Sequence, residues 1–192
     1  MRHGHRFELS EDFIERLEGG KRREAIPPEA VVRRMHLSRE DTVADLGAGI
    51  GYFTFPIARH VHDVVAIDIE PKMIEILNRR SDEKQVTNLR AIRAEVTSTP
   101  IESGSVDHVL AAFVYHEVPS RVALLHEACR ILKEDGRLTI VDFQKTETGF
   151  GPPVEERIAP GAVKREAAKI FSLVDSFETD IYYQLMFKKH SN

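Results

Sequence analysis

The order of the expected elements predicts an α/β protein with a doubly wound, mostly parallel sheet. Strand-like and helix-like segments alternate from residue 42 to residue 143, and the expected strands are nearly continuous apolar runs. Such strands are buried on both faces, so helices must cover both sides of the sheet. A glycine-rich turn after the first of these strands is also typical of this fold. The 192 residues suffice for one domain with its own core.

Two helices are expected before the alternating region. The first covers residues 8–18, with Ser10 as its cap and a glycine pair as its stop signal. The second follows Pro27 and covers residues 28–37. Between them, the segment "GGKRRE" is short and mixes basic with acidic residues, which favours a solvated turn.

Residue types indicate where the strands and helices of the alternating region lie. The run "DVVAIDI" is rich in β-branched residues, as expected of a buried strand. Pro71 stands at the first position of a helix, where its missing N–H is not needed. The expected strands are residues 42–49, which run into a turn, 63–69, 89–95, 106–114 and 137–143; the expected helices are residues 51–61, 71–81 and 121–133.

The C-terminal part breaks this alternation. Residues 144–161 are rich in glycine and proline and are expected to form a loop, with Phe150 as its aromatic residue. Residues 162–174 are expected to form a helix and residues 177–189 a long strand. A strand that arrives last, with no helix after it, adds to an edge of the sheet or inserts antiparallel.

The composition is that of a globular protein, with 42% hydrophobic residues, 30% charged residues and a formal net charge of −4. No apolar run approaches the roughly 20 residues of a membrane-spanning helix, and the first residues lack the features of a secretion signal. We therefore expect a cytoplasmic protein without a membrane span. Basic residues are scattered among acidic ones, which disfavours nucleic acid as the main partner.

The candidate thiol and metal ligands are few. Cys129 is the one cysteine, which excludes an intramolecular disulfide and a thiolate zinc cluster. It lies on the apolar stripe of an expected helix, which favours a buried thiol over a nucleophile. His3 and His5 could ligate a metal, but their place near the chain end favours a frayed terminus. We expect no metal site.

The glycine-rich turn lies in the segment "VADLGAGIGYF", residues 43–53. Gly47 and Gly49 would let the backbone approach a ligand closely, and Gly51 would let the next helix pass close to the strand. A dinucleotide fingerprint has the spacing G-x-G-x-x-G, but Tyr52 stands where its last glycine would fall. The spacing therefore disfavours NAD and FAD.

Two acidic residues follow the next expected strands. Asp68 ends the second strand, about 20 residues after the glycine turn, where a carboxylate can accept both ribose hydroxyls of an adenosine. Glu95 ends the third strand, where it could accept the exocyclic amine of an adenine, with Val96 beside the base. Each has a simpler alternative, because Asp68 could cap a helix and Glu95 could be a surface acid. A shared cofactor site explains all these strand ends together.

These segments resemble the class I S-adenosylmethionine-dependent methyltransferases. The resemblance covers roughly residues 25–189 and is carried by residues 43–53, 64–73 and 93–118. Pro100 and the "GSVD" segment keep the spacing that follows the adenine-binding acid in that family. The resemblance implies a seven-stranded sheet with an antiparallel last strand. We expect a helical extension over residues 1–25 and a cofactor-binding domain over residues 26–192.

S-adenosylmethionine is the cofactor that this resemblance implies. In such a site Asp45 reaches the methionine amine and Asp68 holds the ribose. Glu95 stands where the family more often has an aspartate, so its contact with adenine departs from the usual pattern. The expected cofactor-binding residues are Asp45, Gly47, Ala48, Gly49, Tyr52, Phe53, Asp68, Ile69, Met73, Glu95, Val96 and Ala112.

Catalytic candidates follow the fourth and fifth expected strands. Tyr115, His116 and Glu117 lie just past the fourth strand, where the methyl group would point. His116 could act as a general base with Glu117 as its orienting partner, or it could only pack at the strand end. Asp142 and Gln144 end the fifth strand and face the same mouth. A base is needed only if the acceptor holds its proton at neutral pH.

A small-molecule acceptor is favoured. The sequence lacks the Asn-Pro-Pro-aromatic signature of amino-modifying nucleic-acid enzymes and a separate recognition domain. The first helices and loop 144–161 would form the acceptor pocket, with the loop as a mobile lid. A protein or RNA methyltransferase with a partner subunit, and a non-catalytic S-adenosylmethionine-binding module, stay as alternatives. Exposed edge strands suggest a homodimer.

Overall fold

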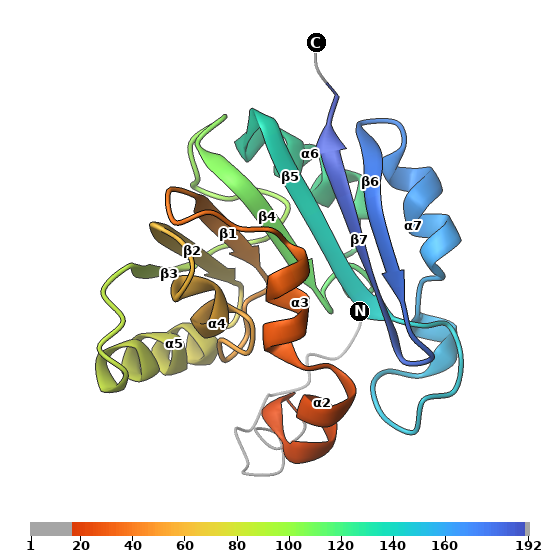
Figure 1. Cartoon of the computed structure of the whole chain (residues 1–192), viewed down its shortest axis with the longest axis horizontal. Helices are drawn as coiled ribbons and strands as arrows, with labels where there is room; N and C mark the ends of the chain where they lie inside the picture. The colour runs from red at the N-terminus through yellow and green to blue at the C-terminus, as the bar shows by residue number, and fades with distance from the viewer. Residues whose placement is uncertain (1–16, 191–192) are drawn as a thin grey trace.

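The computed structural model describes residues 17–190. His3, His5 and almost all of the helix expected over residues 8–18 lie outside the described residues. The elements, drawn in Figure 1, are α2 (Gly20–Ala25), α3 (Pro28–Arg34), β1 (Thr42–Leu46), α4 (Thr54–Ala58), β2 (Asp63–Asp68), α5 (Pro71–Glu83), β3 (Leu89–Arg93), β4 (Val106–Ala112), α6 (Arg121–Ile131), β5 (Leu132–Phe143), η1 (Val154–Glu156), α7 (Pro160–Ala167), β6 (Phe171–Glu178) and β7 (Tyr182–Lys189).

Seven strands form one sheet in the order β3-β2-β1-β4-β5-β7-β6 (Figure 1). The pairs between β3 and β5 are all parallel, whereas β7 pairs antiparallel with both β5 and β6. The expected fold class, with its antiparallel last strand, is confirmed. The winding reverses between β1 and β4, and in open sheets of this kind ligands bind beyond the carboxyl ends of the strands at that point.

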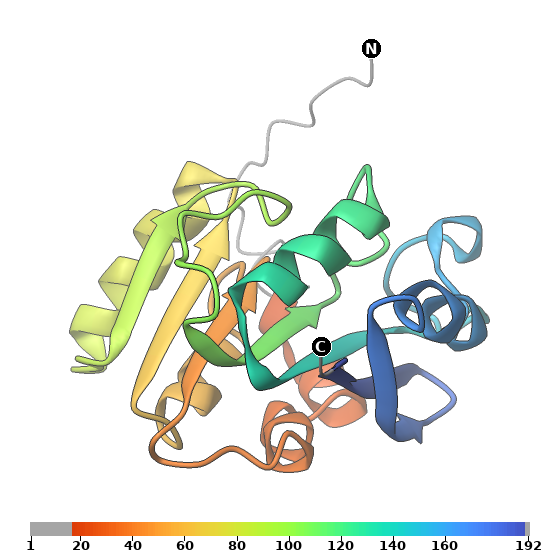
Figure 2. The same cartoon turned by 90° about the horizontal axis from the view of Figure 1, so that it is seen from above.

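Helices cover both faces of the sheet (Figures 1 and 2). On one face, Leu125 of α6 and Val163 of α7 join the largest buried cluster. On the other face, Val31 of α3 and Ile57 of α4 pack in a second cluster, and Leu77 of α5 packs beside β2. Full burial of each such aliphatic side chain contributes about 1.5–3 kcal/mol. Two covered faces explain why the strand sequences are continuously apolar.

The C-terminal elements differ from those expected. The helix expected over residues 162–174 ends at Ala167, and Phe171 begins β6, an edge strand with buried Phe171 and exposed Leu173 and Val174. The long strand expected over residues 177–189 is a hairpin, because β6 ends at Glu178 and Thr179 donates its N–H to the Tyr182 carbonyl across the turn. Thr179 and Asp180 are residue types that favour such a turn.

Three other boundaries also differ. The "GGKRRE" segment is not a turn, since its last five residues form most of helix α2. Helix α4 covers only Thr54–Ala58, because the glycine turn occupies the residues before it. Strand β5 starts at Leu132, directly after α6, and a register shift against β4 accommodates the residues before Arg137.

Two further expectations concern the described residues. Cys129 of α6 is half-buried and packs against the core cluster. Within residues 17–190, no helix is both long enough and apolar enough to cross a bilayer.

Candidate active site

The glycine turn lies at the carboxyl end of β1, against the end of β2. Its N–H groups at Gly47 and Ala48 both donate to the carbonyl of Ile67, at 2.8 and 3.0 Å. Gly47 and Gly51 have φ values of 77° and 90°, which disfavour any side chain. A Cβ at Gly47 would lie 2.7 Å from Val114, and one at Gly51 would collide with the Phe55 ring. These two glycines are therefore required by the close approach of the segment after β4 and of α4.

Asp68 is bonded to the glycine turn. Its Oδ2 accepts the N–H of Gly49 at 2.8 Å, and its Oδ1 accepts the N–H of Glu70 at 2.9 Å, just before α5. Burial raises the pKa of Asp68, and the two N–H groups partly offset this rise. Asp68 thus organises the turn and the start of α5 at once. The helix-cap alternative is compatible with a ligand role, because each carboxylate oxygen can accept a further hydrogen bond.

Asp45 is almost fully buried at the end of β1, with 2% of its surface exposed. Its Oδ2 accepts the hydroxyl of Thr54 at 2.6 Å. Burial raises the pKa of the Asp45 carboxyl to about 7 and the charge of Asp68 adds to this rise, although the Thr54 hydroxyl opposes it. A buried carboxyl without a cationic partner among residues 17–190 is suited to a ligand that brings a positive charge.

The other expected cofactor residues occupy different environments. The hydroxyl of Tyr52 donates to the Ile26 carbonyl at 2.9 Å, so this side chain joins the turn to the start of α3. The remaining positions are as follows: Phe53 stacks on Phe113, Met73 is buried beside Ile50 and Ile76, Ile69 is 52% exposed and Ala112 is buried at the end of β4, Glu95 is exposed and Val96 is half-buried.

His116 is held by Asp142, at the end of β5. The Nδ1 atom of His116 lies 2.8 Å from Oδ1 and 3.0 Å from Oδ2 of Asp142. Asp142 is fully buried and also accepts the N–H of Phe143. Burial alone would lower the pKa of His116, but the hydrogen bond and charge of Asp142 outweigh it, so the pKa is raised. The sequence suggested Glu117 as the partner, but its carboxylate is exposed and lies 3.8 Å from Nε2.

Tyr115 and Gln144 do not join His116. Tyr115 is fully buried in the α6 and α7 face, where its hydroxyl donates to Glu166 at 2.8 Å. Burial raises the pKa of this hydroxyl, and Glu166 raises it further. Arg121 holds Glu166 with two hydrogen bonds. The Gln144 amide bonds weakly to Glu178. Tyr115 is thus a structural residue, because its hydroxyl is paired with Glu166 on the face of the sheet that α6 and α7 cover.

Aromatic side chains form a cluster beside His116. Phe143 lies 4.6 Å from Phe113, 5.8 Å from Phe150 and 6.5 Å from His116, measured between ring centres. Phe113 has a φ of 57°, a conformation that is rare for a bulky residue and often marks functional sites. Sequence reasoning missed Phe113 and Phe143, because only the strand order brings the ends of β4 and β5 together.

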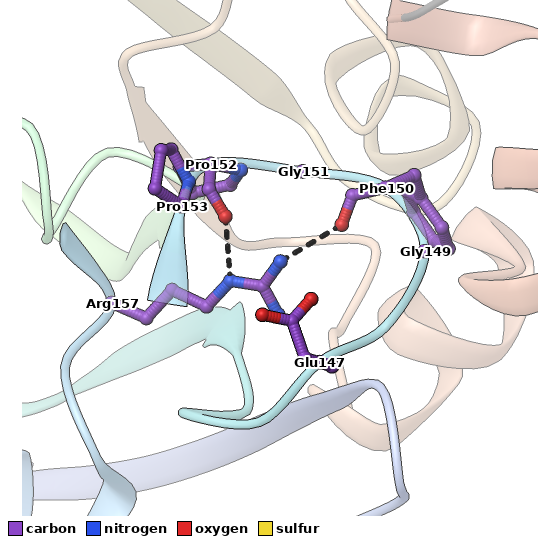
Figure 3. A pocket seen from close by; sticks show the side chains of 7 residues that line it. All are labelled: Glu147, Gly149, Phe150, Gly151, Pro152, Pro153 and Arg157. Atoms are coloured by element: carbon purple, nitrogen blue, oxygen red, sulfur yellow. Dashed lines mark hydrogen bonds between the residues drawn. The ribbon is translucent and has the colours of Figure 1, made fainter. Parts of the chain in front are cut away.

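The loop after β5 is organised around Arg157. This guanidinium, only 3% exposed, donates to the carbonyls of Pro152, Thr146 and Phe150 and to other oxygens of the loop. Figure 3 shows it facing the Pro152 and Phe150 oxygens, with Glu147 alongside. The loop surrounds a hollow of about 360 Å³. The sequence suggested a mobile lid. In the structure, the hydrogen bonds of Arg157 connect several parts of this loop.

The site has no metal-binding cluster within residues 17–190. Its glycine turn, two strand-end acids and reversal of winding are the features that the sequence resemblance implied. The family model described as "Methyltransferase domain" matches residues 44–140, about half of the chain. This chain belongs to the class I methyltransferase family.

Relatives of this methyltransferase extend the comparison. An uncharacterized methyltransferase of Bacillus subtilis is 26% identical over 117 residues, which are 61% of this chain and 46% of that protein. A ubiquinone/menaquinone biosynthesis C-methyltransferase of Rhizobium johnstonii is 34% identical over 110 residues, 55% of this chain and 42% of that protein. The chain thus spans about half the length of the curated relatives it matches.

The fold of this methyltransferase also resembles solved structures. A SAM dependent methyltransferase from Aquifex aeolicus has a TM-score of 0.87 and 23% sequence identity, and the match covers 95% of this chain and 100% of that chain. At this level of identity the likeness concerns the fold. It includes the sheet whose strand ends carry the site described above.

Proposed function

We propose that the protein transfers a methyl group from S-adenosylmethionine to a small-molecule acceptor. The observation that carries this proposal is the position of His116 and Asp142. Their side chains lie at the ends of β4 and β5, beside the strand ends that carry the glycine turn and Asp45. A cofactor site and a candidate base therefore share one edge of the sheet.

The residues of the glycine turn fit the cofactor. Asp45 would bind its ammonium group and Asp68 its ribose hydroxyls, while the glycines would let the backbone approach the ligand closely. Residues after β2 and β3 would flank the adenosine: Ile69 and Met73 on one side, Glu95 and Val96 on the other. When bound, S-adenosylmethionine supplies a methyl group on a sulfonium, ready for displacement by a nucleophile.

His116 is the general base in this proposal. Asp142 accepts a hydrogen bond from the Nδ1–H of His116, which leaves Nε2 with its lone pair to take a proton from the acceptor. The negative charge of Asp142 then stabilises the imidazolium. The surrounding protein keeps water away from the ring, since only 6% of the His116 side chain is exposed. In-line transfer needs little more than this alignment and removal of the acceptor proton.

The acceptor that suits this space has an apolar or aromatic body and a hydroxyl or similar group that holds its proton at neutral pH. Phe143 lies beside His116, and Phe113 and Phe150 pack against Phe143, so the surroundings of the histidine are aromatic. Two of the relatives are named for quinone biosynthesis, as a C-methyltransferase and a demethylmenaquinone methyltransferase. Those names describe the relatives, and they support a quinone-related ring as the first acceptor class to test here.

The test uses purified protein, S-adenosylmethionine labelled in its methyl group, and a cell extract separated into macromolecules and small molecules. We expect label in the small-molecule fraction, and its loss with His116→Ala. Label in protein or RNA would support the partner-dependent alternative. Binding of the cofactor without transfer to either fraction would support the non-catalytic alternative.

A further inference from the structure

Arg22 of α2 lies over the end of the sheet that carries the site. Its guanidinium carbon is 5.2 Å from the ring centre of Tyr52 and 4.6 Å from that of Phe113. Tyr52 directly follows the glycine turn, and Phe113 directly follows β4. The guanidinium therefore sits above the two strands between which the winding of the sheet reverses.

Helix α2 is fixed at both ends over the glycine turn. Just before its start, Glu18 accepts two hydrogen bonds of 2.8 and 2.6 Å from Arg80 of α5, and Arg80 also donates to the Ile50 carbonyl within the turn. At its end, Ile26 is buried and its carbonyl accepts the Tyr52 hydroxyl. Figure 1 shows α2 beyond the carboxyl ends of the parallel strands. The fold thus holds Arg22 in place.

The Arg22 guanidinium has a buried donor without a partner, which costs free energy when no ligand is bound. Its Nε atom is buried and has no hydrogen-bond partner, and within residues 17–190 no carboxylate lies within ion-pair distance of it. Burial lowers the pKa of Arg22, although the neighbouring Tyr52 and the Asp142 carboxylate oppose this. A buried donor of this kind costs about 1–3 kcal/mol when left unpaired. An anionic ligand group would satisfy it.

We propose that Arg22 binds the carboxylate of the methionine part of S-adenosylmethionine, an inference that rests on the function proposed above. That part of the cofactor carries one ammonium and one carboxylate. Asp45 suits the ammonium, but the carboxylate would meet the negative charges of Asp45, Asp68 and Asp142 unless a cation accompanied it. Arg22 is a cation held at this place, and its planar guanidinium matches a carboxylate with paired hydrogen bonds.

The experiment compares two ligands that differ only in this carboxylate. Calorimetric titration measures the affinity of wild-type protein, Arg22→Ala and Arg22→Lys for S-adenosylmethionine and for decarboxylated S-adenosylmethionine. Arg33→Ala, which removes an exposed arginine from α3, is the matched control for charge. Circular dichroism melts verify that each variant is folded.

We expect Arg22→Ala to weaken S-adenosylmethionine binding by about 10–100-fold. Decarboxylated S-adenosylmethionine should bind wild type and Arg22→Ala within about twofold of each other. Arg22→Lys keeps the charge and should lose less affinity than Arg22→Ala. Arg33→Ala should behave as wild type with both ligands.

Other outcomes would overturn the proposal. An equal loss for both ligands would show that Arg22 only supports the shape of the site. Unchanged cofactor affinity with a raised KM for the acceptor would assign Arg22 to the acceptor instead. If wild-type protein binds neither ligand, the proposed function itself fails, and this result is distinct because it appears before any variant is compared.

Discussion

Asp142 Oδ1 lies 2.8 Å from Nδ1 of His116, and both side chains are buried at the carboxyl ends of neighbouring parallel strands. The two residues are 26 positions apart in the sequence. Register between β4 and β5 brings them together, because Ala112 pairs with Val141 at the ends of those strands. A histidine with one nitrogen occupied by a buried carboxylate has a fixed tautomer and a free second nitrogen.

Replacement of His116 tests its role as base. His116→Ala should lower kcat by about 10²–10⁴-fold, since no other group would accept the proton, while cofactor affinity stays unchanged. Glu117→Gln is the control, and we expect an effect below tenfold because its side chain is 69% exposed. Steady-state kinetics with an identified acceptor give both values. A wild-type kcat in His116→Ala would show that the histidine is not the general base.

The pH dependence of the rate reports the pairing with Asp142. A base must be neutral to accept a proton, so kcat/KM should rise as pH increases through the pKa of His116, which lies above its ordinary value of 6.5. Asp142→Asn removes the negative charge that raises this pKa. The rising limb should therefore move to lower pH in that variant, together with a lower maximum rate. If the rising limb does not move, the ionisation that it reports does not belong to the His116–Asp142 pair.

Cofactor affinity should depend on the charge of Asp45. Its pKa of about 7 means that the carboxyl loses its proton as pH rises through neutrality. Because the ionised form binds an ammonium group, S-adenosylmethionine affinity should increase from pH 6 to pH 8, by up to about tenfold per unit below the pKa. Asp45→Asn should show weak and pH-independent binding. The same raised pKa makes the free energy of unfolding fall as pH rises from 3.8 towards 7, since the folded state holds the proton more tightly.

Thr54→Val refines this test. In the wild-type protein the Thr54 hydroxyl donates to Asp45 and favours the ionised carboxylate. Without it, the midpoint of the affinity change should move to higher pH. Titrations at several pH values measure the midpoint, and an unchanged midpoint would assign the pH dependence to another group.

Substitutions of two glycines in the turn should affect the stability of the fold and the cofactor affinity differently. Gly51→Ala places a Cβ against the Phe55 ring at a φ of 90°, so we expect the free energy of unfolding to fall by about 2–5 kcal/mol. Gly49→Ala meets open space at a φ of 55° and should cost less than Gly51→Ala. Its added methyl group would occupy the ligand side of the turn, so cofactor affinity should fall. Denaturant melts and calorimetry measure the two effects, and equal stability losses without a difference in affinity would contradict this division.

The sequence predicted the parallel core and the strand-end acids because both depend on local patterns. Apolar runs define β1, β2, β4 and β5, and the turn glycines follow β1 directly. The tail was less predictable, since Phe171 to Val174 reads equally well as helix or strand until the edge position of β6 is known. Glu117 was suggested as the partner of His116 because it is adjacent in sequence.

Contacts between residues that are far apart in the sequence could not be predicted from local patterns. Arg22 stood in a segment with mixed charges, and its place over Phe113 depends on how α2 lies across the turn. The domain boundary after residue 25 stays a prediction, although buried Ile26 packs in the same cluster as α3. A homodimer through edge strands also stays a prediction.

Calorimetric titration with S-adenosylmethionine, its demethylated product and NAD tests the central claim most directly. Asp68→Ala is the matched variant, because Asp68 joins the glycine turn to the expected ribose position. We predict micromolar binding of S-adenosylmethionine and its product, loss of that binding in Asp68→Ala, and no binding of NAD. If neither compound binds, or NAD binds in their place, the assignment of this site to S-adenosylmethionine is wrong.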